Sequence, residues 1–333
     1  MKILRTAILG CGSFAHRHAQ NCLSLKDEIT LTAFSDHHIE NARAYSEKYS
    51  EGHATIHTDH HELLDKENLD LLIVCLPPFA HSDEVHYAAR KGVHLLMEKP
   101  IALTSEQAWQ MVEAVEQAGI KSQVGFMFRF GEAVEELKSL IETGAAGKVG
   151  LMAARYFCNS LHAKWWRQRE KSGGQLVEQI IHIVDLVRYL LGEPSSVYSR
   201  QENLLHQDVP DYTIEDVSAT VLSFRNGAMG MITATNGAIP NRWISEYQVV
   251  TQKITAEFAN ANNATFHFTD QENVPTRVIA STRNIHLEEL RDLVAAIRAG
   301  YATRTPMREG AKSLDLALAA RRSAEERKEI WLK

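Results

Sequence analysis

The chain has 333 residues, of which 44% are hydrophobic and 23% charged. That composition is typical of a globular protein and excludes a disordered chain, a fibre or a disulfide-stabilised miniprotein, while the length favours two domains of roughly 150 residues. With 36 basic and 42 acidic side chains the net charge is −6, which argues against binding to nucleic acid or an anionic membrane. No apolar run approaches the ~18 residues that span a bilayer, and neither a signal peptide nor a CxxC pair is recognisable. We therefore expect a cytoplasmic protein with reduced cysteines.

The first third of the chain alternates short apolar runs with amphipathic stretches. Strands are predicted at Thr6–Leu9, Thr30–Ser35, Leu69–Leu76, Val93–Met97 and Lys121–Phe126, and helices at Phe14–Leu25, Ile39–Tyr49, Ser82–Lys91 and Ser105–Gln117. Strands separated by helices in this way predict a parallel sheet with right-handed crossovers. We expect residues 1–123 to form this α/β domain.

From about residue 125 the pattern changes to runs rich in β-branched and aromatic residues. Helices are predicted at Glu132–Glu142, Leu287–Ala299 and Glu309–Lys328, and strands at Leu151–Cys158, Val217–Phe224, Ala228–Ala234, Tyr247–Thr251, Ile254–Phe258 and Thr265–Thr269. Asn226-Gly227 is typical of a hairpin turn between two of these strands. Residues 124–333 are therefore expected to form an α+β domain with a largely antiparallel, open sheet.

A glycine-rich segment follows the first predicted strand and opens the first helix. It reads Gly10-Cys11-Gly12-Ser13-Phe14-Ala15, which is GxGxxA in the context of a Rossmann dinucleotide-binding fold: glycines allow the turn and the approach of a pyrophosphate, and the helix N-terminus supplies N–H groups. Asp36, followed by His37, ends the second strand, where a carboxylate accepts hydrogen bonds from ribose hydroxyls and repels a 2′-phosphate. NAD is thus favoured over NADP. The alternative is a structural turn and a surface aspartate.

Two further segments lie at the carboxyl ends of predicted parallel strands, the edge where ligands bind in open α/β sheets. The third long strand ends at Leu76-Pro77-Pro78, and His81 opens the next helix, either as a ligand or as an ordinary helix-terminus residue. Val93–Met97 runs into Glu98-Lys99-Pro100, in which the proline restricts the preceding lysine. We expect Lys99 to point toward the dinucleotide.

The stretch Ser172–Pro194 predicts one long, largely buried helix, started by a Ser172/Gln175 capping box and ended by Gly192. Its ionisable residues Glu178, His182 and Asp185 are spaced i, i+4 and i+7, which puts them on one stripe. A carboxylate one turn from an imidazole can orient it for general acid/base catalysis. The alternative is a core histidine with a structural salt bridge.

Together, GCGSFA, LPP with His81, EKP and GG followed by Glu178-x-x-x-His182 resemble the Gfo/Idh/MocA oxidoreductases, a family that includes inositol dehydrogenases and glucose–fructose oxidoreductase. The resemblance covers nearly the whole chain. It implies a Rossmann domain, an α+β domain whose open sheet forms subunit contacts, and NAD(P)-dependent redox chemistry at a sugar or polyol carbon. It also implies Lys99 as the EKP lysine and His182 as the catalytic histidine. The family's usual aspartate is Glu178 here, and the third glycine of its GGG is Gln175.

From the residues and this resemblance we predict an NAD-dependent dehydrogenase or reductase of a sugar, inositol or related polyol. The catalytic residues are expected to be Lys99, His182 and Glu178. The cofactor-binding residues are expected to be Gly10, Cys11, Gly12, Ser13, Phe14, Asp36, His37, Leu76, Pro77, Pro78, His81, Glu98, Lys99 and Arg167. The substrate-binding residues are expected to be Lys99, Arg129, Trp165, Asp185 and His182.

Two other functions remain open on the same fold: a non-catalytic dinucleotide sensor, and a glycosidase that uses bound NAD for transient oxidation. We expect no metal, because neither His57–His61 nor His16–His18 offers a complete ligand set. A homodimer or homotetramer, without nucleic acid or membrane partners, is the expected assembly.

Overall fold

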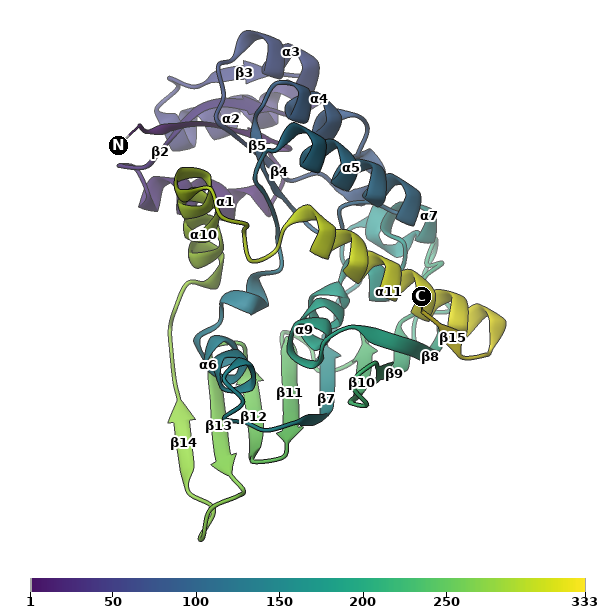
Figure 1. Cartoon of the computed structure of the whole chain (residues 1–333). Coiled ribbons are helices and arrows are strands. Elements are labelled where there is room, and N and C mark those ends of the chain that lie inside the picture. The colour runs from purple at the N-terminus through teal and green to yellow at the C-terminus, as the bar shows by residue number, and fades with distance from the viewer. Residues whose placement is uncertain (1, 333) are drawn as a thin grey trace. The chain divides into compact units, whose positions relative to one another are not determined.

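The computed structural model describes residues 2–332 and divides the chain into two compact units (Figure 1). The first comprises the chain up to Gly125 together with His286–Ala311, and the second comprises Phe126–Ile285 together with the chain from Lys312 onward. The segment His286–Ala311 therefore belongs to the first unit, whereas the prediction placed it in the second domain, residues 124–333. Among the described residues, no helix is both long enough and apolar enough to cross a bilayer.

The first unit is built on a parallel sheet with the strand order β3-β2-β1-β4-β5-β6. The strands are β1 (Leu4–Leu9), β2 (Ile29–Ser35), β3 (Thr55–His57), β4 (Leu71–Val74), β5 (His94–Met97) and β6 (Ser122–Val124). β1 and β4 are adjacent and carry the point where the strand order reverses, so the loops that follow them form the crevice in which such sheets bind ligands. The predicted Rossmann domain is confirmed.

Helices pack on this sheet through apolar side chains. They are α1 (Ala15–Ser24), α2 (Ile39–Ser50), α3 (His60–Lys66), α4 (Glu84–Arg90), α5 (Ser105–Ala118) and α10 (Ile285–Ala299), with a short 3₁₀ turn η1 (Pro78–Ala80). Leu290, Leu293 and Val294 of α10 join one buried cluster with residues of α1, α2, β1 and β2. The shared core explains why a helix from the far end of the sequence belongs to the first unit.

The second unit contains a mixed sheet in the order β14-β13-β12-β11-β7-β10-β9-β8-β15. Its strands are β7 (Val149–Phe157), β8 (Pro194–Glu202), β9 (Val217–Phe224), β10 (Met229–Thr235), β11 (Ile244–Thr251), β12 (Ile254–Asn260), β13 (Asn263–Phe268), β14 (Thr276–Ile279) and β15 (Ile330–Trp331). β7 and β10 pair in parallel, and the other neighbours in the described sheet pair antiparallel. The largely antiparallel sheet and the hairpin at Asn226-Gly227 are confirmed; β8, β14 and β15 were not predicted.

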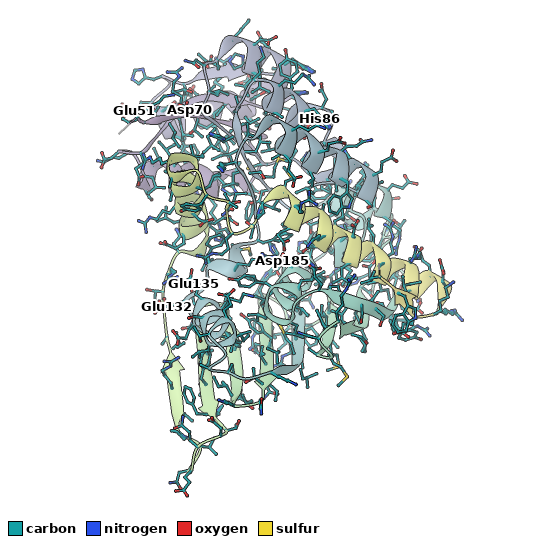
Figure 2. All side chains as sticks on the ribbon, in the orientation of Figure 1. Glu51, Asp70, His86, Glu132, Glu135 and Asp185 are labelled. Atoms are coloured by element: carbon teal, nitrogen blue, oxygen red, sulfur yellow. The ribbon has the colours of Figure 1, made fainter. Side chains whose placement is uncertain are left out.

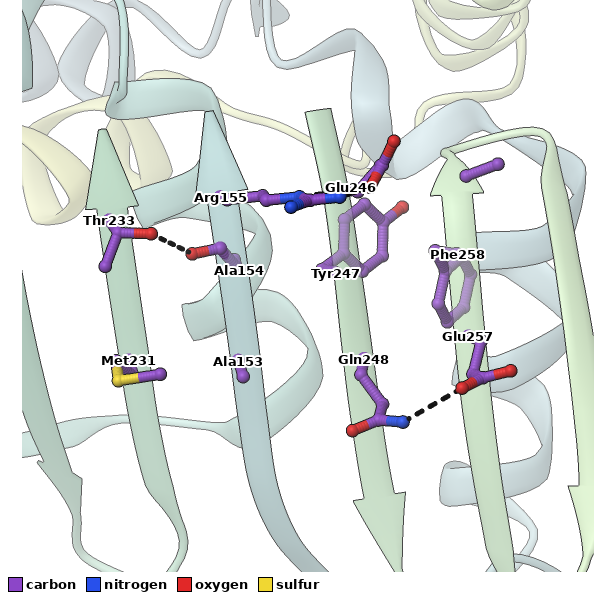
Figure 3. A pocket seen from close by; sticks show the side chains of 11 residues that line it. Ala153, Ala154, Arg155, Met231, Thr233, Glu246, Tyr247, Gln248, Glu257 and Phe258 are labelled. Carbon is purple, nitrogen blue, oxygen red and sulfur yellow. Dashed lines mark hydrogen bonds and ion pairs between the residues drawn. The ribbon is translucent and has the colours of Figure 1, made fainter. Parts of the chain in front are cut away.

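The helices of the second unit are α6 (Glu132–Glu142), α7 (Arg169–Ser172), α8 (Gln175–Glu178), α9 (Ile181–Leu191) and the larger part of α11 (Met307–Glu326), with 3₁₀ turns η2 (Met127–Phe130) and η3 (Lys164–Arg167). Of these, α6, α8, α9 and α11 contribute to the buried core on one face of the sheet. On the other face, side chains such as Val221, Met229 and Met231 are exposed. This face also carries a hollow of about 510 Å³, crossed by the Arg155–Glu246 ion pair and the Gln248–Glu257 hydrogen bond (Figure 3).

Candidate active site

The loop between β1 and α1 requires its glycines for different reasons. Gly10 has φ +88°, and a Cβ there would lie 2.6 Å from the carbonyl oxygen of Cys75, so only glycine fits where this loop touches the chain after β4. At Gly12 an added Cβ would meet no described atom within 4 Å. The loop is thus tightly held at Gly10 and open at Gly12, which is the arrangement a dinucleotide-binding turn needs.

Helix α1 begins at this loop with its first amide groups uncovered. Its N-cap is Phe14, and no side chain of residues 2–332 caps it with a hydrogen bond. Gly12, Ser13 and Phe14 are exposed. Uncapped N–H groups at a helix N-terminus attract phosphate oxygens, so the sequence-predicted loop fits a dinucleotide pyrophosphate.

Asp36 lies at the end of β2 and is fixed by three donors. Its Oδ2 accepts a hydrogen bond from the backbone N–H of Cys11 at 2.8 Å, and its Oδ1 accepts from His38 N–H at 2.9 Å and from Asn41 Nδ2 at 3.2 Å. His37 is exposed beside it. The carboxylate is therefore tied directly to the glycine loop, the geometry expected of a ribose-binding acid.

Cys11 itself is a buried thiol. Burial, and then the negative charge of Asp36, raise the pKa of Cys11 to about 12. The thiol remains protonated at neutral pH, so Cys11 contributes its backbone and small volume to the loop rather than a reactive thiolate.

The segment after β4 leaves the sheet as predicted, through Leu76, Pro77 and η1. His81 is buried and bonds to Glu84, with 2.6 Å between its Nδ1 and Oε1 of Glu84. Glu84 Oε2 also accepts a hydrogen bond from Ser82 N–H at 2.7 Å. These contacts support the structural alternative for His81, in which the imidazole holds the turn at the start of α4.

In the second unit the predicted long helix is wrong. Between Ser172 and Pro194 the chain forms two helices, α8 and α9. The N–H of Ile180 bonds to the carbonyl of Gln175 at 3.1 Å, a wide i to i−5 turn that interrupts the helical hydrogen bonds between α8 and α9. Gln179 at this break donates to His162 Nε2 at 3.2 Å, so a tertiary contact accompanies the wide turn. Glu178 and His182 therefore do not share one regular helical stripe.

The predicted capping box at Ser172/Gln175 is also wrong. The Ser172 hydroxyl accepts from Gly174 N–H at 3.1 Å, and the amide of Leu176 donates to Oε1 of Glu215 at 2.8 Å. Glu215 is buried, and a Cβ on Gly174 would lie 2.7 Å from its Oε2. Burial raises the pKa of Glu215, although Arg169 and the Leu176 amide act in the opposite direction. Local spacing carries no signal for this cap, because Glu215 is far away in the sequence.

His182 lies on the first turn of α9 and is 8% exposed. Its ring centroid is 6.4 Å from that of Phe126, edge to face, and 5.4 Å from that of Phe128. Two phenyl rings thus restrict the imidazole. Because the Nδ1 atom is buried, Nε2 is the ring nitrogen that can reach a ligand.

Arg129 and Asp185 form a buried bidentate ion pair. Arg129 Nε donates to Asp185 Oδ2 at 2.8 Å and its Nη2 to Oδ1 at 2.6 Å, while the hydroxyl of Ser313 donates to the same carboxylate at 3.0 Å. Asp185 is 1% exposed and lies on α9 (Figure 2). The pair joins η2 to α9 next to His182. Both side chains were predicted to bind substrate, and their bonds to each other agree with the alternative of a structural salt bridge.

The remaining predicted residues lie around η3. The indole N–H of Trp166 donates to Oε2 of Glu178, which is half-buried. Arg167 donates to the carbonyls of Leu161 at 2.7 Å and His162 at 3.1 Å, so its guanidinium shapes the preceding loop. Trp165 is half-buried beside the small cluster of Trp166, Tyr212 and Ile214.

A polar network near η3 and α8 was missed by the sequence analysis. Gln179 contacts both His162 and the Cys158 sulfur, and Asn236 Nδ2 donates to the Tyr212 hydroxyl at 3.0 Å. The ring of His162 lies 4.2 Å from that of Trp166. Each residue comes from a different segment, so only the folded chain brings them together.

One histidine cluster has metal-ligand character. Ligand atoms of Asp59, His60 and His61 lie within 4.8 Å of one another at the start of α3. Asp59 caps α3 through Glu62 N–H at 3.0 Å, and the two histidines bond to Asp83 at 2.8 and 3.1 Å. These hydrogen bonds within the chain are sufficient to explain why the three side chains lie close together.

Comparison with protein families agrees with this geometry. Residues 4–126 match the model of the oxidoreductase family with an NAD-binding Rossmann fold, Gfo/Idh/MocA, and residues 138–333 match the model of that family's C-terminal α/β domain. The chain belongs to the Gfo/Idh/MocA family. The resemblance noted from the motifs is confirmed, and the protein is an NAD-binding oxidoreductase.

Individual relatives are similar over most of the chain. Myo-inositol 2-dehydrogenase of Thermotoga maritima is 27% identical over 335 residues, covering 99% of this chain and 98% of that protein. The scyllo-inositol 2-dehydrogenase (NAD(+)) of Bacillus subtilis is 30% identical over 238 residues, covering 70% of this chain and 67% of that protein. Levoglucosan dehydrogenase in complex with NADH and L-sorbose shares the fold with a TM-score of 0.92 at 20% identity, with all of both chains covered.

Proposed function

We propose that this family member is an NAD-dependent dehydrogenase that transfers hydride between nicotinamide and a carbon of an inositol, a sugar or a related polyol. The observation that carries the proposal is the open N-terminus of α1 joined to the fixed carboxylate of Asp36. The named activities of the inositol 2-dehydrogenase relatives support the substrate class.

The preference for NAD follows from Asp36. Its Oδ2 accepts from the glycine loop and its Oδ1 from the His38 amide, and further lone pairs of the carboxylate can accept from ribose hydroxyls. A 2′-phosphate would bring negative charge against a carboxylate that is only 7% exposed, where water screens the repulsion poorly. His37 follows Asp36, and no arginine stands at that position.

For the chemical step we propose His182 as the general acid/base. Its Nε2 accepts the proton of the substrate hydroxyl during oxidation and returns it during reduction. The bound nicotinamide supplies the hydride acceptor or donor. Lys99 places a positive charge near the alkoxide that develops as the proton leaves, where fixed charge contributes most to the rate.

The other predicted residues take supporting roles in this proposal. Arg129 and Asp185 hold α9 in place beneath His182 through their buried pair. Glu178 remains a catalytic candidate, with Oε2 oriented by Trp166. Trp165 and Arg167 are proposed to shape the walls of the substrate and cofactor sites.

We further propose that the helix-free sheet face, including the hollow of Figure 3, forms contacts between copies of this chain. Its exposed Val221, Met229 and Met231 would be buried by a symmetric partner. Light scattering after gel filtration tests this: a dimer or tetramer supports it, and a monomer at micromolar concentration contradicts it.

The first test of function is the formation of NADH at 340 nm with a panel of inositols, polyols, aldoses and sugar acids. Turnover with NAD on at least one member, and weaker turnover with NADP, supports the proposal. NAD binding by calorimetry without turnover across the panel would favour the sensor, and cleavage of glycosides without net NADH would favour the glycosidase.

A further inference from the structure

The turn that carries Lys99 is anchored to helix α1 by a buried side-chain pair. His18 on α1 is fully buried, and its Nε2 lies 2.7 Å from Oε1 of Glu98, the residue before Lys99. Glu98 follows β5 and is 8% exposed. Neither side chain shows a sequence signal for this contact, which joins residues far apart along the chain.

The protonation state of the pair follows from its surroundings. The Nδ1 atom of His18 is buried and has no hydrogen-bond partner among the described residues, so a proton there would be costly. Burial acts to raise the pKa of Glu98, but the hydrogen bond of His18, helped by the positive charge of Lys99, holds this pKa below its ordinary value. Glu98 is therefore a carboxylate, and its Oε1 accepts a hydrogen bond from Nε2 of His18.

The second oxygen of Glu98 points back to the lysine. The backbone N–H of Lys99 donates to Glu98 Oε2 at 3.3 Å. Gly125, after β6, packs so closely that an added Cβ would lie 3.0 Å from the same oxygen. One carboxylate therefore links α1, the end of β6 and the main chain of Lys99.

Aromatic and charged groups enclose the pair. The ring of Phe14, at the N-cap of α1, lies 5.7 Å from that of His18 and 6.0 Å from that of His286 on α10. Burial and then Arg17 lower the pKa of His286 to about 4, so this ring is neutral at pH 7. The loop that we assign to the dinucleotide and the turn that carries Lys99 thus share one packed anchor.

We propose that His18 is a positioning residue for Lys99, acting through Glu98. The pair fixes the Lys99 main chain relative to α1, so that the charge of the lysine is held in register with a dinucleotide bound at the start of that helix. This inference rests on the proposed function for the role of Lys99. Misplacement of a reacting group by 1 Å can cost roughly 100-fold in rate.

The test combines substitutions at both ends of the link. We expect His18→Ala to lower kcat with NAD and myo-inositol by roughly tenfold to 100-fold, while the Kd for NADH changes little. His18→Gln should restore most of the loss, because its amide can donate to the same carboxylate oxygen. His57→Ala removes another buried histidine paired with a glutamate, at 3.3 Å from Glu67, and serves as the matched control.

A double-mutant cycle with Lys99→Ala separates positioning from general support of the fold. If His18 acts through Lys99, the double variant is no slower than Lys99→Ala alone. Losses that multiply would overturn the proposal. If circular dichroism shows that His18→Ala does not fold, Glu98→Gln replaces it in the cycle. The amide keeps the shape of the carboxylate, but only one of its two terminal atoms can accept, so it cannot bond to both His18 and the Lys99 amide.

A second measurement does not depend on turnover. With NADH present, the rate at which acetic anhydride acetylates Lys99 is measured by peptide mass spectrometry. We expect this rate to be severalfold higher in His18→Ala and Glu98→Gln than in the wild type. It should be unchanged in His18→Gln and His57→Ala. Labelling of His18→Ala at the wild-type rate would overturn the proposal. Full activity of Lys99→Ala would instead refute the role assigned to Lys99 under the proposed function, while the labelling still reports on the anchor.

Discussion

Two glycine-led helices, one in each unit, begin in opposite ways. Helix α1 follows Gly10 and Gly12 and has no side-chain cap among the described residues. Helix α8 follows Gly173 and Gly174, and the buried carboxylate of Glu215 occupies its first turn through the amide of Leu176. Glycine provides the room in both cases, but only the first helix leaves its amides for a ligand.

The comparison shows that a glycine pattern before a helix does not by itself identify an anion site. A helix start can bind an anion only if no carboxylate of the chain itself accepts hydrogen bonds from its first amide groups. In the first unit the nearby acid, Asp36, bonds to the loop at Cys11 and leaves the helix start open. In the second unit Glu215 closes the helix start, and the chain beyond it carries His182.

The largest effect is expected from substitution of His182 in the second unit, which should lower turnover without changing the binding of NAD to the first unit. We expect His182→Ala to lower kcat by about 10²–10⁴-fold, because the general acid/base is lost. The Kd for NAD, measured by calorimetry, should stay near the wild-type value. His267→Ala, which removes an imidazole on β13 that pairs with Glu257 on β12, is the control and should retain activity. An equal loss of NAD affinity would contradict the assignment.

Substitution of Asp36 tests the proposed dinucleotide site at the start of α1. Asp36→Ala should reduce kcat/KM for NAD by roughly tenfold to 100-fold, the scale of lost hydrogen bonds to a charged group. It should also narrow the gap between NAD and NADP, because the repulsion of a 2′-phosphate is removed. Steady-state kinetics with both cofactors measure this ratio. An unchanged preference would mean that a different group selects the ribose.

A matched pair of glycine substitutions then addresses the comparison directly. Gly12→Val should weaken NAD binding by roughly tenfold to 100-fold yet leave the free energy of unfolding in urea nearly unchanged. An added Cβ meets no described atom within 4 Å, and the new side chain would occupy the space that we propose for the pyrophosphate. Gly174→Ala should do the reverse and lower the free energy of unfolding by about 1–3 kcal/mol, because φ is +105° and the Cβ meets Glu215.

The control for the second substitution is Gly119→Ala, where φ is +66° and the space is open. Only the backbone strain of about 1 kcal/mol applies there. If Gly174→Ala is no worse than Gly119→Ala, the close packing of Glu215 on the helix start is not important for stability. If it weakens NAD binding as strongly as Gly12→Val, the two helix starts do not have separate roles.

The same contrast explains what the sequence could predict. The Rossmann elements and the GxGxxA loop were predictable because period, turn residues and motif all lie within short stretches. The sequence could not predict that α10 belongs to the first unit, because this depends on the packing of Leu290 and Leu293 against a core formed by residues far away in the sequence. The Ser172–Pro194 helix failed for a similar reason: Glu215 and His162, both distant, replace the predicted cap and accompany the break.

The smallest effect concerns the ionisation of Glu215. Its pKa is raised in the folded chain by burial, so the folded state retains a proton that the unfolded state has released. The contribution of this group to stability is therefore complete below the ordinary glutamate pKa and is lost as pH rises through the folded pKa. Glu215→Gln keeps an oxygen for the Leu176 amide but carries no charge.

The free energy of unfolding of Glu215→Gln minus that of the wild type should consequently increase as pH rises through the folded pKa of Glu215. The size of this increase should be smaller than the loss of stability caused by Gly174→Ala. Urea titrations between pH 5 and pH 8 measure the difference, with Glu106→Gln, at an exposed position of α5, as the control that should show no such trend. A difference that falls as pH rises would mean that Arg169 and the helix amides outweigh burial. The start of α8 would then be stabilised by the charge of Glu215, much as a bound phosphate would stabilise the proposed dinucleotide site at the start of α1.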